Sequence, residues 1–441
     1  MNPSGVIWIG HSDYLDSNTR AITEQVRDAL KTLPHVQVSD DIHIAVTDQQ
    51  AIEAARDILR QNLSGAIIVL ATWVECNVVM SAVKELRGLP ILFWAFPLET
   101  VNGIRESTGS YVSGTMIAGP VRRLELKSQV LLGSWKDEKT LKSVEAFLRA
   151  AYAVNTLFYS KIGLFGYTSM SIYTGTFDHV LMRYLVGPEV EQMDACSLIR
   201  AAEAVPEEEV AQAIAKLTKT APVMEDVKAH KLYKTMALYV ALKAFCAEHN
   251  WTAVNVKCQY DFSKEYRVVP CVALSLLADE GVVASCEGDM LCTVSQMILT
   301  AITGCTSTYG DSLSQEGNVI KFSPCGFMPF SMAAPGVRVQ KFMEHPGFSG
   351  IQVCGVMRPQ RVTFLRLVED VGSYHLVYGT GSGLPTEPRG GCMPALDVEL
   401  DGDANELCKH YAGQHYALVY GDWADELESF AKLMGMQTIR I

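Results

Sequence analysis

An apolar strand that ends in two acids is encoded by Val282-Val283-Ala284-Ser285-Cys286-Glu287-Gly288-Asp289. Because side chains two residues apart on a strand point to the same face, we expect Glu287 and Asp289 to share one face at its carboxyl end. A helical pattern over residues 290–303 follows directly. Sites in α/β architectures gather where strands meet helices, so this junction is a candidate for catalysis or metal binding.

The segments before this junction alternate between apolar strands and amphipathic helices. Strands are predicted at residues 6–10, 65–70, 91–94, 162–166 and 253–258, and helices at residues 19–33, 78–86, 137–159, 207–217 and 226–248. Continuous apolar strands separated by helices indicate parallel sheets covered on both faces. We therefore predict doubly wound α/β sheets in an N-terminal domain, residues 1–160, and in a middle domain, residues 161–316.

The pattern changes after about residue 317 to closely spaced strands with glycine turns. Strands are predicted at residues 318–322, 350–357, 361–368, 374–379 and 416–420, with a last helix at residues 423–434. This spacing is typical of an antiparallel sheet or a small barrel. The predicted fold class is α/β and multi-domain, with a C-terminal antiparallel β-rich domain over residues 317–441.

The composition excludes several classes of partner. Hydrophobic residues make up 49% of the 441 residues, the net charge is −12, and no run of Lys or Arg exceeds the pair Arg122-Arg123. We therefore expect no nucleic-acid partner. No stretch of 18 apolar residues and no charged-then-apolar leader is present, so we expect a soluble, cytoplasmic protein without membrane association.

The twelve cysteines are scattered between Cys76 and Cys408 without a CxxC pair. Several lie inside apolar runs, among them Cys246, Cys258 and Cys271. This pattern favours buried, reduced thiols over a disulfide framework.

A second acid follows the preceding apolar strand, in Lys257-Cys258-Gln259-Tyr260-Asp261-Phe262-Ser263. If the two strands are parallel neighbours, Asp261 and Glu287 emerge at one sheet edge and can converge on a divalent cation. The structural alternative is two acids that stabilise helix N-termini. His415, before the strand at residues 416–420, adds an imidazole, although a histidine beside aromatic residues is commonly structural.

The chain resembles the L-fucose isomerase/L-arabinose isomerase superfamily over roughly residues 160–441. The resemblance rests on the order of four segments, 257–263, Pro270-Cys271, Ser275-Leu276-Leu277 and 285–289, with a histidine near the C-terminus. Members of that family are Mn-dependent aldose-ketose isomerases with three-domain subunits.

The resemblance carries expectations about the site and the assembly. It implies Mn²⁺ or another divalent metal held by Asp261, Glu287, Asp289 and His415, with Asp261 and Glu287 as catalytic groups. It also implies a homo-oligomer, a trimer or hexamer, with the active site near a subunit interface.

Two features depart from the family pattern. The chain is shorter than the L-fucose and L-arabinose isomerases, and Asp261 stands where the arabinose isomerases carry Glu. Glu265, four residues further on, is an alternative ligand or base. The sequence leaves open which of Glu287 and Asp289 binds metal and which acid transfers protons.

Five polar residues are candidates for substrate binding. The loop over residues 10–20 lies between the first strand and the first helix and lacks GxGxxG, which disfavours a dinucleotide. The resemblance implies that His11 and Arg20 of this loop contribute to the active site of a neighbouring subunit. The candidates are His11, Arg20, Gln259, Arg358 and Arg361.

The predicted function is metal-dependent aldose-ketose isomerisation of a monosaccharide through a 1,2-enediol(ate). The resemblance implies sulfoquinovose or an L-fucose- or D-arabinose-like sugar as substrate, and the short chain favours sulfoquinovose. The alternatives are a non-catalytic sugar-binding or regulatory protein, and a metal-dependent aldolase or hydrolase on the same fold.

Overall fold

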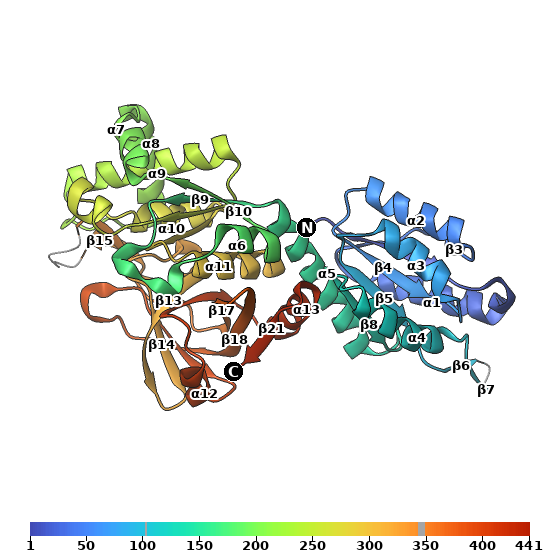
Figure 1. Ribbon diagram of the computed structural model, residues 1–441. Coiled ribbons are helices and arrows are strands. Elements are labelled where there is room, and N and C mark those ends of the chain that lie inside the picture. The colour runs from blue at the N-terminus through green and yellow to red at the C-terminus, as the bar shows by residue number, and fades with distance from the viewer. Residues whose placement is uncertain (102–103, 343–348) are drawn as a thin grey trace. The chain divides into compact units, whose positions relative to one another are not determined.

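The computed structural model describes residues 1–101, 104–342 and 349–441. The chain forms two compact units, labelled by element in Figure 1. The N-terminal unit comprises residues 1–156 and 425–436, and the C-terminal unit comprises residues 157–424 and 437–441. No helix among the described residues is long and apolar enough to cross a membrane.

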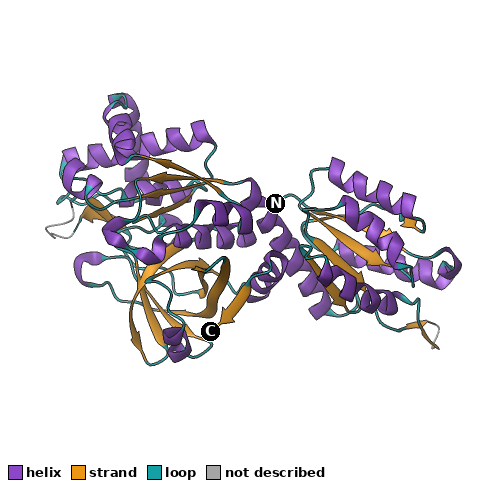
Figure 2. Cartoon of the chain, viewed as in Figure 1, coloured by secondary structure: helices purple, strands orange, loops and turns teal. Residues whose placement is uncertain are grey.

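The N-terminal unit is built on a parallel sheet with the strand order β2-β1-β4-β5-β8, in which β3 also pairs with β1. Every residue of the central strands β4 and β5 is buried, and Figure 2 shows helices on both sides of the sheet. The strands are β1 (Ser4–Ile9), β2 (Val36–Gln37), β3 (Ile44–Ala45), β4 (Gly65–Leu70), β5 (Ile91–Ala95) and β8 (Ser128–Leu132). The helices are α1 (Ser17–Lys31), α2 (Asp48–Arg60), α3 (Cys76–Glu85), α4 (Ser110–Arg123), α5 (Glu138–Tyr159) and α13 (Ala424–Met434), and β6 (Glu99–Val101) and β7 (Ile104–Glu106) form a hairpin.

The C-terminal unit begins with a second parallel sheet of order β10-β9-β11-β12. Strands β11 and β12 are wholly buried neighbours, with Val256 opposite Cys286, which confirms that the two acidic segments leave the same sheet edge. The strands are β9 (Lys161–Phe165), β10 (Glu189–Met193), β11 (Ala253–Val256) and β12 (Val283–Cys286). The helices are α6 (His179–Leu185), α7 (Ala195–Glu203), α8 (Glu207–Thr220), α9 (Ala229–His249), α10 (Cys271–Asp279) and α11 (Met290–Thr303).

An antiparallel barrel completes the C-terminal unit. Its strands run in the order β17-β20-β13-β14-β19-β18, and pairing of β17 with β18 closes the ring. The barrel strands are β13 (Thr308–Glu316), β14 (Val319–Ser323), β17 (Arg361–Asp370), β18 (Ser373–Leu384), β19 (Leu396–Leu400) and β20 (His415–Tyr420). Outside the ring lie β21 (Gln437–Arg440), parallel to β18, the pair β15 (Arg338–Lys341) and β16 (Ile351–Cys354), and α12 (Ala404–Lys409).

Helix α11 joins the parallel sheet to the barrel. It contacts β12 on one side and the barrel strands β17 and β20 on another, and nearly all of its residues are buried. The predicted fold class, parallel α/β sheets followed by an antiparallel β-rich region, is confirmed. The acids before α11 therefore lie where the two kinds of sheet meet.

The expectation that Glu287 and Asp289 share one face of a strand is wrong. Strand β12 ends at Cys286, and both Glu287 (φ 66°) and Gly288 (φ 69°) have left-handed backbone conformations before Asp289 caps α11. A Cβ atom at Gly288 would lie 2.0 Å from the carbonyl oxygen of Tyr167, so only glycine fits there. The two carboxylates are thus positioned by a tight turn rather than by strand alternation.

Candidate active site

His415 lies at the centre of a buried polar cluster in the C-terminal unit. It is the first residue of β20, its cross-strand partner on β13 is Asp311, and its side chain is 1% exposed. The ring Nε2 lies 3.4 Å from Asp311 Oδ1 and 3.5 Å from Glu287 Oε2. Within the described part of the chain, this nitrogen makes no hydrogen bond. One imidazole nitrogen and two carboxylates therefore face one another.

Asp289 holds the other side of the His415 ring. Its Oδ2 lies 2.9 Å from His415 Nδ1 and accepts from Arg366 Nη1 at 2.7 Å, while Oδ1 accepts from the Cys292 amide as the cap of α11. A carboxylate bonded to Nδ1 fixes a proton on that nitrogen, so Nε2, which is directed at the two acids, is the ring nitrogen on which a cation could replace a proton. Asp289 is engaged on both oxygens and orients His415.

Arg366 is a fully buried cation on β17. Besides Asp289, it donates to the backbone carbonyls of His415 and Thr174. Burial alone would raise the pKa of Asp289, but Arg366 and His415 outweigh it and hold this pKa well below its usual range. Burial lowers the pKa of His415, yet the hydrogen bond and charge of Asp289, with the charges of Glu287 and Asp311, raise it to about 9.

Asn255 at the penultimate position of β11 braces the turn that carries Glu287. Its side-chain oxygen accepts from the Gly288 amide at 2.9 Å, and its amide donates to Thr293 Oγ1 at 2.9 Å and Ser285 Oγ at 3.1 Å. The left-handed conformation of Glu287 is costly for a residue with a side chain, so the surrounding hydrogen bonds must enforce it. This rigid turn directs the Glu287 carboxylate at His415.

Asp311 occupies the more open side of the cluster, with its side chain 24% exposed. Burial raises its pKa, the nearby His415 lowers it, and the negative charges of Glu287 and Asp289 raise it again, to about 6. A carboxyl group with this pKa can both accept and donate a proton near neutral pH.

The structure brings together three of the four predicted metal ligands, Glu287, Asp289 and His415. Asp261 instead starts a short helical turn, Asp261–Tyr266, and its carboxylate pairs with Lys257 Nζ at 3.2 Å. Its side chain is 38% exposed, and it is not among the groups that contact His415. Glu265 is exposed on the same turn.

The predicted substrate-binding residues have different surroundings. Gln259 is buried after β11, and its side-chain nitrogen has no hydrogen-bond partner among the described residues. Arg358 donates to the carbonyls of Ser331 and Ala333, and Arg361 pairs with Asp401 and Asp422.

His11 and Arg20 belong to the N-terminal unit. His11 Nε2 lies 3.4 Å from Glu75, and Arg20 is exposed on α1. Their place in a site stays a prediction. Of the five candidates, Gln259 is the one with a buried donor that still lacks an acceptor within the described chain.

Two residues of the cluster, Asp311 and Arg366, were not predicted from the sequence. Strand β13 was not predicted, because it follows α11 closely and its second half is exposed and polar. Nothing local marks Asp311, whose importance comes from its pairing with His415 about a hundred residues away. Arg366 did carry a signal, since it is a lone charge in the apolar run Val362-Thr363-Phe364-Leu365-Arg366-Leu367, which suggests a buried and partnered arginine.

Comparison with known proteins identifies the class. No family model matches the chain. A sulfoquinovose isomerase from Clostridium sp. (strain MSTE9) is 24% identical over 367 residues, which are 81% of this chain and 82% of the relative. One from Priestia aryabhattai is 22% identical over 409 residues, or 89% of each chain. An L-arabinose isomerase from Thermotoga maritima is 24% identical over 194 residues, 43% of this chain and 39% of the relative.

These relatives confirm the resemblance to the aldose-ketose isomerases. The chain is an isomerase of the intramolecular oxidoreductase class. Within that class, it is similar over most of its length to the sulfoquinovose isomerases.

Proposed function

We propose that this protein is a divalent-cation-dependent isomerase that interconverts sulfoquinovose and its ketose. Glu287, Asp311 and His415 form the cation site in this proposal. The observation that carries it is the buried Nε2 of His415, which lacks a hydrogen bond among the described residues and lies within 3.5 Å of two carboxylate oxygens. A neutral imidazole with two carboxylates is a ligand set suited to Mn²⁺ and similar ions.

The donor set fits a cation better than a closed hydrogen-bond network. Two carboxylates directed at one histidine nitrogen repel each other, and a single ring proton cannot satisfy both. A bound divalent cation would stabilise the negative charge that develops on the sugar oxygens O1 and O2 in the enediolate. Asp289 and Arg366 keep His415 in the orientation that this site requires.

The remaining chemistry is proton transfer by carboxylates. Isomerisation removes a proton from C2, delivers one to C1 and moves a proton between O2 and O1. We assign the transfer between C2 and C1 to Glu287, which is buried and rigidly held, and the transfer between the oxygens to Asp311. The greater exposure of Asp311, 24% of its side chain, supports this assignment, because the group must exchange its proton with the substrate oxygens.

Gln259 has a supporting role in this proposal, and Asp261 is an alternative to Asp311. Both follow β11 at the sheet edge that also carries Glu287. The unpartnered side-chain amide of Gln259 supplies a donor for a sugar hydroxyl. Asp261 was predicted as a metal ligand and base, and it remains the alternative to Asp311 in both roles. Mn²⁺ binding by variants of the two residues distinguishes between them as ligands. The substrate follows the names of the relatives that align over most of the chain.

Mn²⁺ binding tests the ligand set directly. The metal-stripped full chain is titrated with Mn²⁺, and the free ion is followed by its electron paramagnetic resonance signal. We expect one tight ion per chain, with affinity reduced at least tenfold by Asp311→Asn and by His415→Ala, and changed less than threefold by Asp261→Asn. Loss of binding in Asp261→Asn with full binding in Asp311→Asn would restore the sequence-based ligand set.

A further inference from the structure

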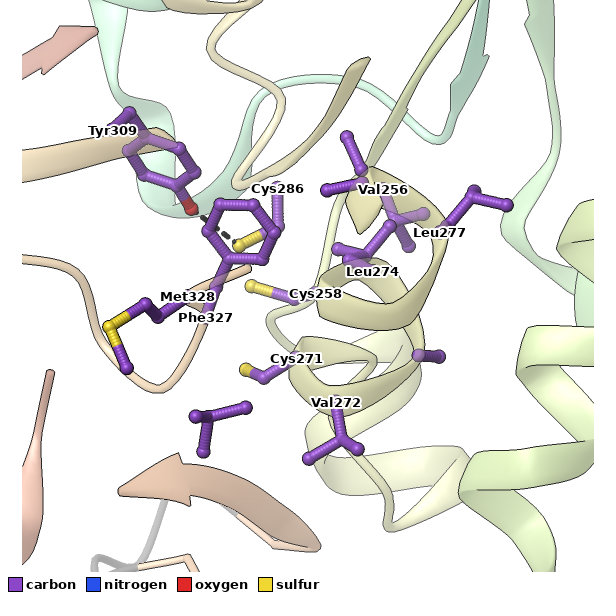
Figure 3. Close-up of a cluster of buried hydrophobic side chains, with 14 of the residues drawn as sticks. Val256, Cys258, Cys271, Val272, Leu274, Leu277, Cys286, Tyr309, Phe327 and Met328 are labelled. Carbon is purple, nitrogen blue, oxygen red and sulfur yellow. Dashed lines mark hydrogen bonds between the residues drawn. The ribbon is translucent and has the colours of Figure 1, made fainter. Parts of the chain in front are cut away.

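A group of buried cysteine thiols lies beside Glu287 and has no part in the proposed isomerisation. Cys258 follows β11, Cys271 begins α10 and Cys286 ends β12, and Figure 3 shows their three sulfur atoms in one row along the core. One ligand atom each from Cys258, Cys286 and Glu287 lies within 4.8 Å of the other two. Cys325 approaches from the segment after β14, with Sγ 3.3 Å from Glu287 Oε1.

Apart from the hydroxyl of Tyr309, the other side chains labelled around these thiols in Figure 3 are apolar. Phe327 and Met328 flank the sulfur atoms opposite α10 in Figure 3, and the hydroxyl of Tyr309 lies 2.8 Å from Cys286 Sγ. A buried cysteine often serves only as a small apolar side chain. Here, however, two thiols lie within reach of a carboxylate that is itself directed at a candidate cation site, and this combination is a ligand set.

We propose that Cys258, Cys286 and Glu287 form a second cation site, selective for thiophilic divalent ions such as Zn²⁺ and Cd²⁺. Tetrahedral zinc with Zn–S bonds of about 2.3 Å places two sulfur ligands about 3.8 Å apart, which the 4.8 Å grouping accommodates with small rotamer changes. Cys325, whose Sγ lies 3.3 Å from Glu287 Oε1, is the candidate for a fourth position. Thiolate sulfur favours these ions over Mn²⁺ and Mg²⁺.

Binding at this site displaces protons but transfers no electrons. Each coordinating thiol loses its proton to solvent as its sulfur binds the ion, so one ion held by Cys258 and Cys286 releases two thiol protons. The Glu287 carboxylate is the link to the proposed isomerase site, because it lies within reach of both the thiols and His415. A thiophilic ion that engages Glu287 therefore removes it from the Mn²⁺ site. This last step rests on the proposed function.

Cadmium titration tests the thiol site without reference to activity. The parent protein is the reduced, metal-stripped full chain with Ser at the exposed Cys196, Cys305 and Cys408 and at Cys392. These four thiols then contribute nothing to the cadmium signal. The ultraviolet sulfur-to-cadmium charge-transfer band reports thiolate binding. We expect one Cd²⁺ per chain, with affinity at least tenfold lower in Cys258→Ser and in Cys286→Ser, and unchanged in Cys246→Ser, a buried thiol of α9.

Two outcomes would overturn the thiol site. One is a cadmium band of equal strength and affinity in Cys258→Ser and in the parent, and the other is an equal loss in Cys246→Ser. Cys258→Ala, checked by its thermal unfolding midpoint, replaces the serine variant if that one does not fold. Because the band does not depend on turnover, this result is separate from the fate of the isomerase proposal.

Competition tests the shared carboxylate. Addition of Cd²⁺ is expected to release bound Mn²⁺ from the parent, seen by paramagnetic resonance, and to release at least tenfold less from Cys258→Ser at the same Cd²⁺ concentration. Cadmium that shows the thiolate band but leaves Mn²⁺ bound would refute the shared use of Glu287.

Discussion

At the scale of single residues, the site depends on charges that only tertiary structure brings together. Glu287, Asp289 and His415 could be predicted from the sequence, because each stands beside a recognisable strand or helix and matches the family pattern. Asp311 could not, since its proximity to His415 comes from the pairing of β13 with β20. The family resemblance also implied that Asp289 binds metal, and in the structure its two oxygens are engaged by His415, Arg366 and the Cys292 amide.

The buried pair of Asp289 and Arg366 predicts a large effect on stability. Asp289→Asn leaves the Arg366 guanidinium buried without its counter-charge, which costs about 3 to 5 kcal/mol. Urea unfolding of the cation-free protein measures this loss. The control is Asp57→Asn, which breaks an exposed pair with Arg60 and should cost less than about 1 kcal/mol. Equal losses in the two variants would refute the role given to the buried pair.

The turnover rates of two variants distinguish the proposed role of Asp311 from that of Asp261. We expect Asp311→Asn to lower kcat about 10² to 10⁴-fold, the usual effect of removing a group that transfers a proton. Asp261→Asn breaks a partly exposed pair with Lys257 and should change kcat less than tenfold. Steady-state kinetics at saturating Mn²⁺ makes the comparison. A larger loss in Asp261→Asn would return the proton-transfer role to that residue.

At the scale of elements, the turn between β12 and α11 positions the site. The apolar strand and the helix could be predicted from their patterns, and α11 begins and ends where the sequence indicates. The left-handed pair Glu287 and Gly288 could not, because these conformations depend on contacts with Asn255 and Tyr167. Strand β13 was missed for a related reason, since its polar second half gains its structure from neighbours in the barrel.

One glycine substitution tests the turn between β12 and α11, and a second, on α4, is its control. Position 288 has a positive φ, and a Cβ atom there would lie 2.0 Å from the backbone oxygen of Tyr167. We therefore expect Gly288→Ala to lower the free energy of unfolding by at least about 3 kcal/mol. Gly119→Ala on α4 meets no atom within 4 Å and should stabilise the protein by about 0.5 to 1 kcal/mol. Chemical denaturation measures both, and a neutral Gly288→Ala would contradict the account of the turn.

Strand β10 provides a pH-dependent test through Glu191. Its carboxylate pairs with Lys161 at 2.6 Å and accepts from Trp251 at 2.8 Å. The hydrogen bond from Lys161 lowers its pKa more than burial raises it, and Trp251 and His249 lower it further. Because the folded pKa lies below the unfolded one, the stabilisation is present above the unfolded value and disappears as the pH falls through the folded value.

Thermal unfolding between pH 7 and pH 3 measures this contribution. Glu191→Gln should cost about 1 kcal/mol at pH 7, with a gap to the parent that narrows toward pH 3. Glu189→Gln, on the same strand and opposite Arg183 at 3.4 Å, is the matched control and should show a smaller gap. A gap for Glu191→Gln that stays constant with pH would contradict the assignment.

At the scale of the whole molecule, the proposed cation site lies entirely within the C-terminal unit. Its side chains come from the turn after β12, from β13 and from β20, and α11 contacts both the parallel sheet and the barrel around them. The succession of parallel sheets and a β-rich region could be predicted from sequence periodicity. The closure of the barrel through β17 and β18, and the grouping of α13 with the first 156 residues, are long-range pairings that no local pattern encodes.

The proposed activity is tested most directly by turnover of sulfoquinovose. The metal-stripped full chain is incubated with the sugar in D₂O, with and without Mn²⁺, and the ketose is followed by nuclear magnetic resonance. We predict ketose formation only after Mn²⁺ is restored, with solvent deuterium at C1 of the product. The proposal would be contradicted if no ketose formed from sulfoquinovose or from a panel of neutral aldoses with Mn²⁺ present. An equal rate of ketose formation in the presence of a chelator would contradict its dependence on a cation.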